Sequence, residues 1–237
     1  AVWSRMAYFG ETMAQASLIG VALALAFDAD VTVGILVATL AAAGLIVAAQ
    51  GQKLVPLDSI LGLMHHGALA LGVVAAAMLK GPSVDLTGYL FGDVLAISSR
   101  DLVWIYGGGA LVLAAIYQLW EPLLRLAVHA ELAEAEGVNG PRIRALLTLL
   151  VAVAIAFAVK VAGILLAIAF LVVPAAAARP WAATPERMVI GAALVGMVSA
   201  LAGLLLSFKA DVPAGPAIVL VMAVLAALSL ARAVLKS

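Results

Sequence analysis

Long apolar runs separated by short polar stretches recur along almost the whole chain. A membrane-spanning helix needs about 20 apolar residues to cross about 30 Å of hydrocarbon. The runs predict about eight such helices, several of them short enough to need little tilt, at residues 12–28, 32–50, 57–79, 101–119, 145–160, 163–178, 188–206 and 213–232. The predicted fold class is therefore all-α, a polytopic membrane helical bundle that forms one domain over residues 1–237.

The composition supports a membrane location and excludes several classes of protein. Hydrophobic residues make up 66% of the 237 residues and charged residues only 11%, whereas soluble domains are about 25% charged. The charges of the 13 basic and 13 acidic residues cancel. The sequence has no basic patch of the kind that binds nucleic acid. The sequence has no cysteine, which excludes disulfides and thiolate metal sites.

Basic residues near the predicted span ends indicate the orientation of the chain, because cytoplasmic loops are enriched in Lys and Arg. They place the N-terminus, the 120–144 segment and the C-terminus in the cytoplasm. The basic residues that support this orientation are Arg5, Lys53, Arg125, Arg142, Arg144, Arg179, Arg187, Arg232 and Lys236. The opposite loops carry mainly aspartates, with a few basic exceptions. One exception is Lys160, which we expect to extend along the helix to the outer surface.

Two segments fit neither a span nor a simple loop. Residues 83–98 are apolar but too short to cross, so we expect a short helix that lies at the outer face or dips into the bundle. Residues 121–144 form an amphipathic segment, in which Leu124, Val128 and Leu132 recur at helical spacing. The apolar stripe of this segment either packs on its own bundle or docks into a groove on a soluble partner, and the spacing alone leaves both readings open.

Ionisable residues inside the predicted spans are the candidates for function, because such residues usually face a bundle interior or a cavity. Asp58, Gly62 and His66 are spaced i, i+4 and i+8, so they lie along one side of a helix. Asp58 and His66 are about 12 Å apart along its axis, too far to bind one ion together but suitably placed for successive steps of a polar pathway. Neutral imidazole is also a common zinc ligand.

Each of these candidates also has a purely structural explanation. His66 can hydrogen-bond a carbonyl of a neighbouring helix, and Asp58 can cap its helix. Glu11 lies near the start of the first span, where a carboxylate in the first turn is favoured by the helix dipole. His65 points about 100° away from His66, and we expect it to serve only in packing. The sequence contains no P-loop, GxSxG or HExxH motif, so no enzyme activity is predicted.

Several stretches resemble the ABC-type metal permease family, and within it the zinc permeases. They follow one another in the same order along nearly the whole chain: "RMAYFGETMAQASLIGVALAL", "LDSILGLMHHGALALGVV", "LTGYLFGDVLAIS", "ELAEAEGVN", "VKVAGILLAIAFLVVPAAAAR" and "VPAGPAIVLV". The resemblance implies the transmembrane fold of the vitamin B12 permease class of ABC importers. It also implies a bacterial inner (plasma) membrane location, with both termini of this chain cytoplasmic.

The resemblance further implies partners and roles for particular residues. The implied partners are a second permease copy, two ATPase subunits that bind ATP, and a periplasmic metal-binding protein; the chain itself would bind no cofactor. The coupling helix that enters the ATPase groove corresponds to Glu131, Leu132, Ala133, Glu134, Ala135, Glu136 and Gly137. His66 and Asp58 fall on a histidine and an aspartate of the zinc permeases, so with Glu11 they are the predicted transport pathway, and His66 a transient metal ligand.

The chain departs from the family pattern at two places. Gln15 stands where the family usually has histidine, which weakens the assignment of the metal. The family also has a span before "RMAYFG", so we expect that the first family helix is missing from this chain.

The sequence thus predicts the permease subunit of an ATP-driven importer for a divalent transition metal, with zinc favoured. An ABC permease for manganese or iron is one alternative. A proton-coupled secondary metal transporter is another, with His66 and Asp58 as proton relay groups and no cytoplasmic partner.

Overall fold

The structure is a computed structural model that describes residues 7–51, 54–78, 86–92 and 99–235. In these ranges every regular element is a helix. The elements are α1 (Ala7–Ala26), α2 (Val31–Gln50), α3 (Leu57–Met78), α4 (Leu86–Phe91), α5 (Ser99–Val128), α6 (Ala130–Ala135), α7 (Gly140–Ala178), the 3-10 turn η1 (Arg179–Trp181), α8 (Pro185–Ala210) and α9 (Ala214–Val234).

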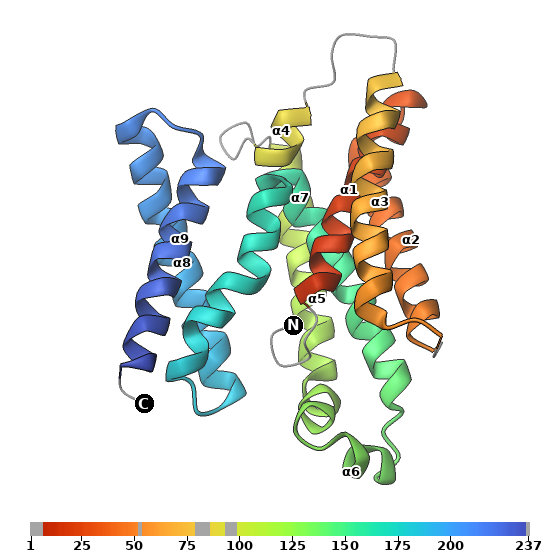
Figure 1. Ribbon diagram of the computed structural model, residues 1–237, viewed down its shortest axis with the longest axis vertical. Coiled ribbons are helices and arrows are strands. Elements are labelled where there is room, and N and C mark those ends of the chain that lie inside the picture. Colours follow the sequence, from red (N-terminus) through yellow and green to blue (C-terminus); the bar gives the residue numbers. More distant parts are fainter. Residues whose placement is uncertain (1–6, 52–53, 79–85, 93–98, 236–237) are drawn as a thin grey trace.

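Helix α1 is the centre of one half of the bundle and packs against α2, α3 and α7. Its inner residues Met13, Ala14 and Leu18 are buried. Helices α8 and α9 pack on each other and on α7, and form the other half of the molecule (Figure 1). The short helices α4 and α6 lie at opposite ends of the bundle, and the C-terminal end of α9 points towards the end that carries α6.

Helix α7 changes direction at Gly163. Its 39 residues would extend about 58 Å as one straight helix, about twice the hydrocarbon thickness. Gly163 instead has φ 76° and ψ 169°, and the chain rises to this point and then descends beside α8 and α9 (Figure 1). Seven of the described helices are long and apolar enough to cross a membrane, and the two arms of α7 match the separately predicted spans 145–160 and 163–178.

A close backbone contact with α4 holds the turn in α7. Gly92 follows α4 with φ 72°, and a Cβ atom on Gly92 or on Gly163 would overlap the backbone of the other segment. The described part of the predicted outer helix 83–98 is α4, with only Leu86–Phe91 helical; Asp85 and Asp93 lie outside the described residues. The short helix therefore lies at the end of the bundle where α7 reverses.

Lys160 lies just before this turn and forms an ion pair at this end of the bundle. Its Nζ is 2.8 Å from Asp101 Oδ1 of α5, and the two side chains are only 26% and 22% exposed. Lys160 also donates a hydrogen bond to Thr32 Oγ1 at the start of α2. The ammonium group therefore connects α7 to α2 and α5, because a half-buried cation is stabilised by an anionic partner.

We expect Gly163→Ala to lower the unfolding temperature of the purified protein in detergent. The substituted side chain has to adopt a positive φ, which costs about 1–3 kcal/mol, and it meets the backbone of Gly92. Gly44→Ala is the matched control, because a Cβ on Gly44 meets no atom within 4 Å and Ala favours the helix by up to about 1 kcal/mol. Equal unfolding temperatures for the two variants would contradict this account of the turn.

Candidate functional site

A polar cavity of about 440 Å³ lies between α1 and α3. All three predicted pathway residues contribute to it. It is lined by Tyr8, Glu11 and Thr12 of α1 and by Asp58, Leu61, Gly62, His65 and His66 of α3. Both helices are apolar enough to span the membrane, so the cavity gathers ionisable side chains inside a membrane bundle.

The α3 wall of the cavity follows the predicted periodicity. Asp58, Gly62 and His66 all line it, as expected for residues on one side of a helix. Asp58 lies inside the first turn of α3, where the helix dipole stabilises a carboxylate. The side chains of Asp58 and His66 are both exposed in the single chain, so the polar wall is open rather than enclosed.

Glu11 supplies the carboxylate on the α1 wall. The described part of α1 begins at Ala7 and has no acidic residue in its first turn, so a stabilising role for Glu11 at the helix start does not explain its position. Glu11 Oε1 lies 3.8 Å from His65 Nε2, with the two side chains 40% and 17% exposed. The contact is an ion pair when the imidazole is protonated, and it joins α1 to α3.

His65 therefore lies on the cavity, whereas the sequence led us to expect only a packing role. Its ring meets the ring of His66 edge-on, with centroids 4.7 Å apart and planes at 78°. Spacing along α3 could not identify His65 as a cavity residue, because its partner, Glu11, is on another helix. The i, i+4, i+8 spacing within α3 places Asp58 and His66 on one side of the helix. It does not show which face of α3 meets α1.

The cavity offers separate ligands rather than a closed metal site. Among the residues that the structure describes, no three or more His, Cys, Asp and Glu side chains are grouped closely enough to hold a metal ion. Two carboxylates and two imidazoles on the two walls of the cavity can still exchange single ligands with a hydrated cation. Weak successive contacts of this kind permit passage, whereas a tight cage retains the ion.

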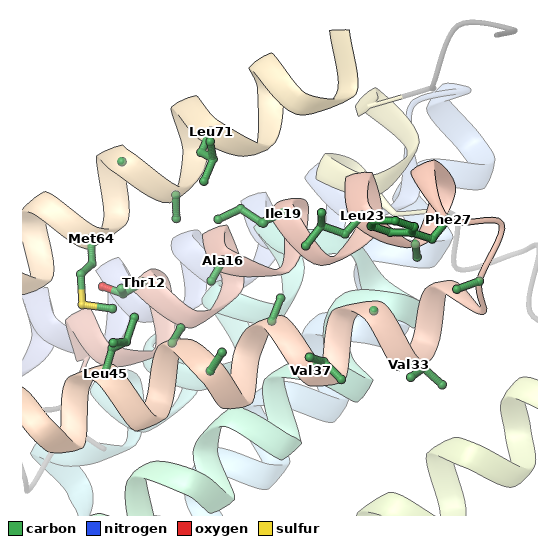
Figure 2. A pocket seen from close by; sticks show the side chains of 18 residues that line it. Thr12, Ala16, Ile19, Leu23, Phe27, Val33, Val37, Leu45, Met64 and Leu71 are labelled. Atoms are coloured by element: carbon green, nitrogen blue, oxygen red, sulfur yellow. The ribbon is translucent and has the colours of Figure 1, made fainter. Parts of the chain in front are cut away.

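A second hollow, of about 530 Å³, is lined by residues of α1, α2 and α3 and is almost entirely apolar (Figure 2). Its α3 wall consists of Met64, Gly67, Ala68 and Leu71, which lie on a different side of the helix from Asp58 and His66. Thr12 is shared with the polar cavity. Helix α3 therefore separates an apolar surface suited to lipid or protein packing from a polar surface that is unsuited to lipid.

A groove of about 720 Å³ lies at the other candidate site, where α5 meets α6. It is lined by Leu124, Arg125, Val128, His129, Leu132, Ala133 and Glu136. Arg125 donates hydrogen bonds to Glu121 Oε1 at 2.6 Å and to Glu136 Oε2 at 3.1 Å. The guanidinium group thus fixes the end of α5 to the chain that follows α6.

The predicted segment 121–144 is divided in the structure. Its first part, up to Val128, continues α5 past Pro122, and a separate helix α6 starts at Ala130. The predicted coupling residues Glu131, Leu132, Ala133, Glu134 and Ala135 are in α6, with Glu136 and Gly137 directly after it. Gly137 has φ 89° and ends the helix as expected.

The side chains of α6 divide into an inner and an outer set. Ala133 is buried, whereas Leu132 is 59% exposed; the side chain of Glu134 lies outside the described set. An exposed leucine on a short helix at one end of the bundle leaves apolar surface available to another protein.

Comparison with known proteins places these features in a family. The model of the ABC 3 transport family matches residues 1–233. The high-affinity zinc uptake system membrane protein ZnuB of Haemophilus influenzae is 41% identical over 229 residues, covering 97% of this chain and 88% of that protein. The manganese transport system membrane protein MntC of Halalkalibacterium halodurans is 35% identical, covering 94% of this chain and 77% of that protein.

A solved structure has the same fold. PsaBC from Streptococcus pneumoniae in complex with Fab matches with a TM-score of 0.84 at 29% identity, covering 96% of this chain and 82% of that chain. The expected all-helical permease fold is thus confirmed, and so is the resemblance on which it was based. A match over almost the entire chain, together with a relative at 41% identity, shows that this chain belongs to the ABC 3 transport family.

Proposed function

We propose that the chain is the membrane-spanning permease subunit of an ATP-driven importer that carries zinc. The observation that carries the proposal is the cavity in which Glu11, Asp58 and two histidines meet inside membrane-spanning helices. Family membership supports transport rather than catalysis, and the relative named for zinc uptake is 41% identical. ATP hydrolysis is assigned to a separate partner subunit, because this chain has no P-loop motif with which to bind the phosphates of ATP.

A second copy of the chain is the proposed neighbour of the polar wall of α3. Asp58 and His66 are exposed in the single chain, and an ionisable side chain that faces lipid is costly. Two copies related by a two-fold axis would place these walls opposite one another and enclose a water-lined pathway. The transported ion then meets the same ligands from both sides.

The α5–α6 groove is the proposed contact with an ATPase subunit. The exposed Leu132 provides an apolar anchor beside the charged side chains of Arg125, Glu121 and Glu136. Closure of two ATPase subunits would move α6, and the Arg125–Glu136 contact would transmit the movement to α5. A periplasmic metal-binding protein would dock at the end that carries α4.

This assignment of ends follows the loop charges. We place α6 and the C-terminal end of α9, which lie towards one end of the bundle, in the cytoplasm of a bacterium, with the chain in its inner membrane. The basic residues Arg142 and Arg144 lie near α6 and support this orientation through the positive-inside rule.

Zinc is favoured over manganese because the cavity contains two imidazoles. Imidazole nitrogen suits zinc, whereas manganese prefers sites built from carboxylate, carbonyl and water oxygens. A manganese permease of the same family remains the alternative, since relatives named for manganese transport are 35% and 31% identical. Membership of an ABC family disfavours the proton-coupled transporter.

Reconstitution in proteoliposomes with the ATPase and the metal-binding protein tests the pathway. We expect Glu11→Gln, Asp58→Asn and His66→Ala each to lower the initial rate of zinc uptake about tenfold, which corresponds to a loss of about 1.4 kcal/mol. Assembly with the ATPase should be unchanged. Thr39→Val is the matched control, because Thr39 is a buried polar residue of α2 whose hydroxyl donates to the Ile35 and Leu36 carbonyls of the same helix.

Unchanged uptake in all three variants would remove these residues from the pathway. Equal losses in the Thr39→Val control would mean that uptake responds to general damage of the bundle and not to the cavity.

The coupling role of α6 has a separate test. We expect Leu132→Asp combined with Gly137→Val to abolish the stimulation of ATP hydrolysis by the metal-loaded binding protein, because the apolar anchor and the helix end are both altered. Leu235→Asp is the control, since Leu235 is 85% exposed at the far end of α9. Normal stimulation in the double variant would show that the ATPase contacts another surface.

A further inference from the structure

Three exposed arginines lie where α7, α8 and α9 reach one end of their half of the bundle. They are Arg179 in η1, Arg187 in the first turn of α8 and Arg232 in the last turn of α9. The end of α7, the start of α8 and the end of α9 lie at the same end of the molecule (Figure 1). The segments 179–187 and 229–235 contain one acidic residue, Glu186, so three positive charges outweigh one negative charge here.

Two linked hydrogen bonds fix an aromatic side chain at this end. Trp181 Nε1 donates to Ser229 Oγ at 2.7 Å, and Ser229 Oγ donates to the Ala177 carbonyl at 2.6 Å. The two bonds connect η1 and the end of α7 to α9, while Trp181 remains 55% exposed. Arg232 follows Ser229 by three residues, so it lies on the same side of α9 and about one turn nearer the helix end.

An apolar surface begins directly beside these charges and continues towards the middle of the bundle. Val189 and Ile190 follow Arg187 within one turn of α8 and are 55% and 62% exposed. Leu228 precedes Arg232 by one turn of α9 and is 57% exposed. Both helices are long and apolar enough to cross a membrane. The surface is therefore basic and aromatic at its end and apolar at depth.

The opposite end of the α8–α9 pair carries balanced charges. The ionisable residues of the segment 207–213, which connects the two helices there, are Lys209 and Asp211. The excess of positive charge thus belongs to one end of this half of the molecule, and it is complementary to an anionic ligand.

We propose that the joined ends of α7, α8 and α9 bind the headgroup of an anionic phospholipid of the cytoplasmic leaflet. The planar guanidinium groups of arginine match the oxygens of a phosphate group, and tryptophan is enriched at the level of lipid headgroups. The acyl chains lie along the exposed apolar residues of α8 and α9. Basic sites between membrane helices on the cytoplasmic side are suited to such lipids.

The apolar part of the surface favours a lipid over a soluble partner. A soluble protein can contact the arginines and Trp181, but it cannot reach apolar side chains that lie within the hydrocarbon. A phospholipid contacts both parts at once and connects α9 and α8 to η1. The inference goes beyond ion transport, and of the proposed function it uses only the orientation of the bundle.

The unfolding temperature of the purified full chain in a neutral detergent tests the site. We expect added phosphatidylglycerol to raise this temperature and an equal mole fraction of phosphatidylcholine to leave it unchanged. Arg187→Gln and Arg232→Gln should each raise the half-maximal mole fraction of phosphatidylglycerol about fivefold, because one basic side chain near an anionic lipid surface contributes about 1 kcal/mol. Lys209→Gln is the matched control, since it removes an exposed basic residue from the other end of α8.

Two results would overturn the proposal directly. One is the same half-maximal mole fraction for the unaltered protein and for both arginine variants. The other is an equal loss in Lys209→Gln, which would indicate a general attraction of basic side chains to anionic micelles. Stabilisation by inorganic phosphate as large as that by phosphatidylglycerol would show a phosphate site instead of a lipid site and would also overturn it.

Assembly with the ATPase subunit separates the lipid from a protein partner. We expect both arginine variants to assemble normally. Failure of assembly together with an unchanged response to phosphatidylglycerol would make this surface a protein contact and would overturn the lipid site. The lipid measurement requires no zinc and no transport, so its failure leaves the proposed ion pathway in place, and unchanged uptake by the pathway variants leaves the lipid site in place.

Discussion

The structure depends on one physical constraint: ionisable side chains in a membrane must be kept away from lipid. Glu11, Asp58 and the two histidines lie within spanning helices, where contact with hydrocarbon is costly for the charged groups. Helix α3 meets the constraint by presenting Asp58 and the two histidines to the polar cavity and an apolar surface on another side. The direction of the polar side then decides where water, an ion and a second copy of the chain can lie.

Charged contacts also occur at both ends of the bundle. Lys160 is half-buried, and it is stabilised by Asp101 and Thr32 at the level where α7 reverses. At the opposite end Arg125 is held by Glu121 and Glu136. Each end therefore has a charged contact between segments, while the middle of the bundle relies on close packing of small residues around α1.

The sequence predicts what depends on periodicity along one helix, and it fails where two helices must meet. The spans, the common side of Asp58 and His66, and the end of α6 at Gly137 all follow from spacing and local conformation. The approach of His65 to Glu11 and the ion pair of Lys160 depend on helix packing, which spacing within one helix does not determine. Helix α5 continues through Pro122 to Val128, beyond the end of the predicted span 101–119 and into the predicted amphipathic segment.

Access of water to α3 tests the central claim most directly, and the absence of cysteine from the sequence provides a clean background. Single cysteines would replace Asp58, Gly62 and His66 on the polar side, and Gly67 and Leu71 on the apolar side, in the assembled importer in membranes. We predict that a charged, water-soluble thiol reagent labels the first three positions and that zinc slows the labelling. Labelling of Gly67 and Leu71 with protection of the other three would contradict the account, because the polar side of α3 would then not face water.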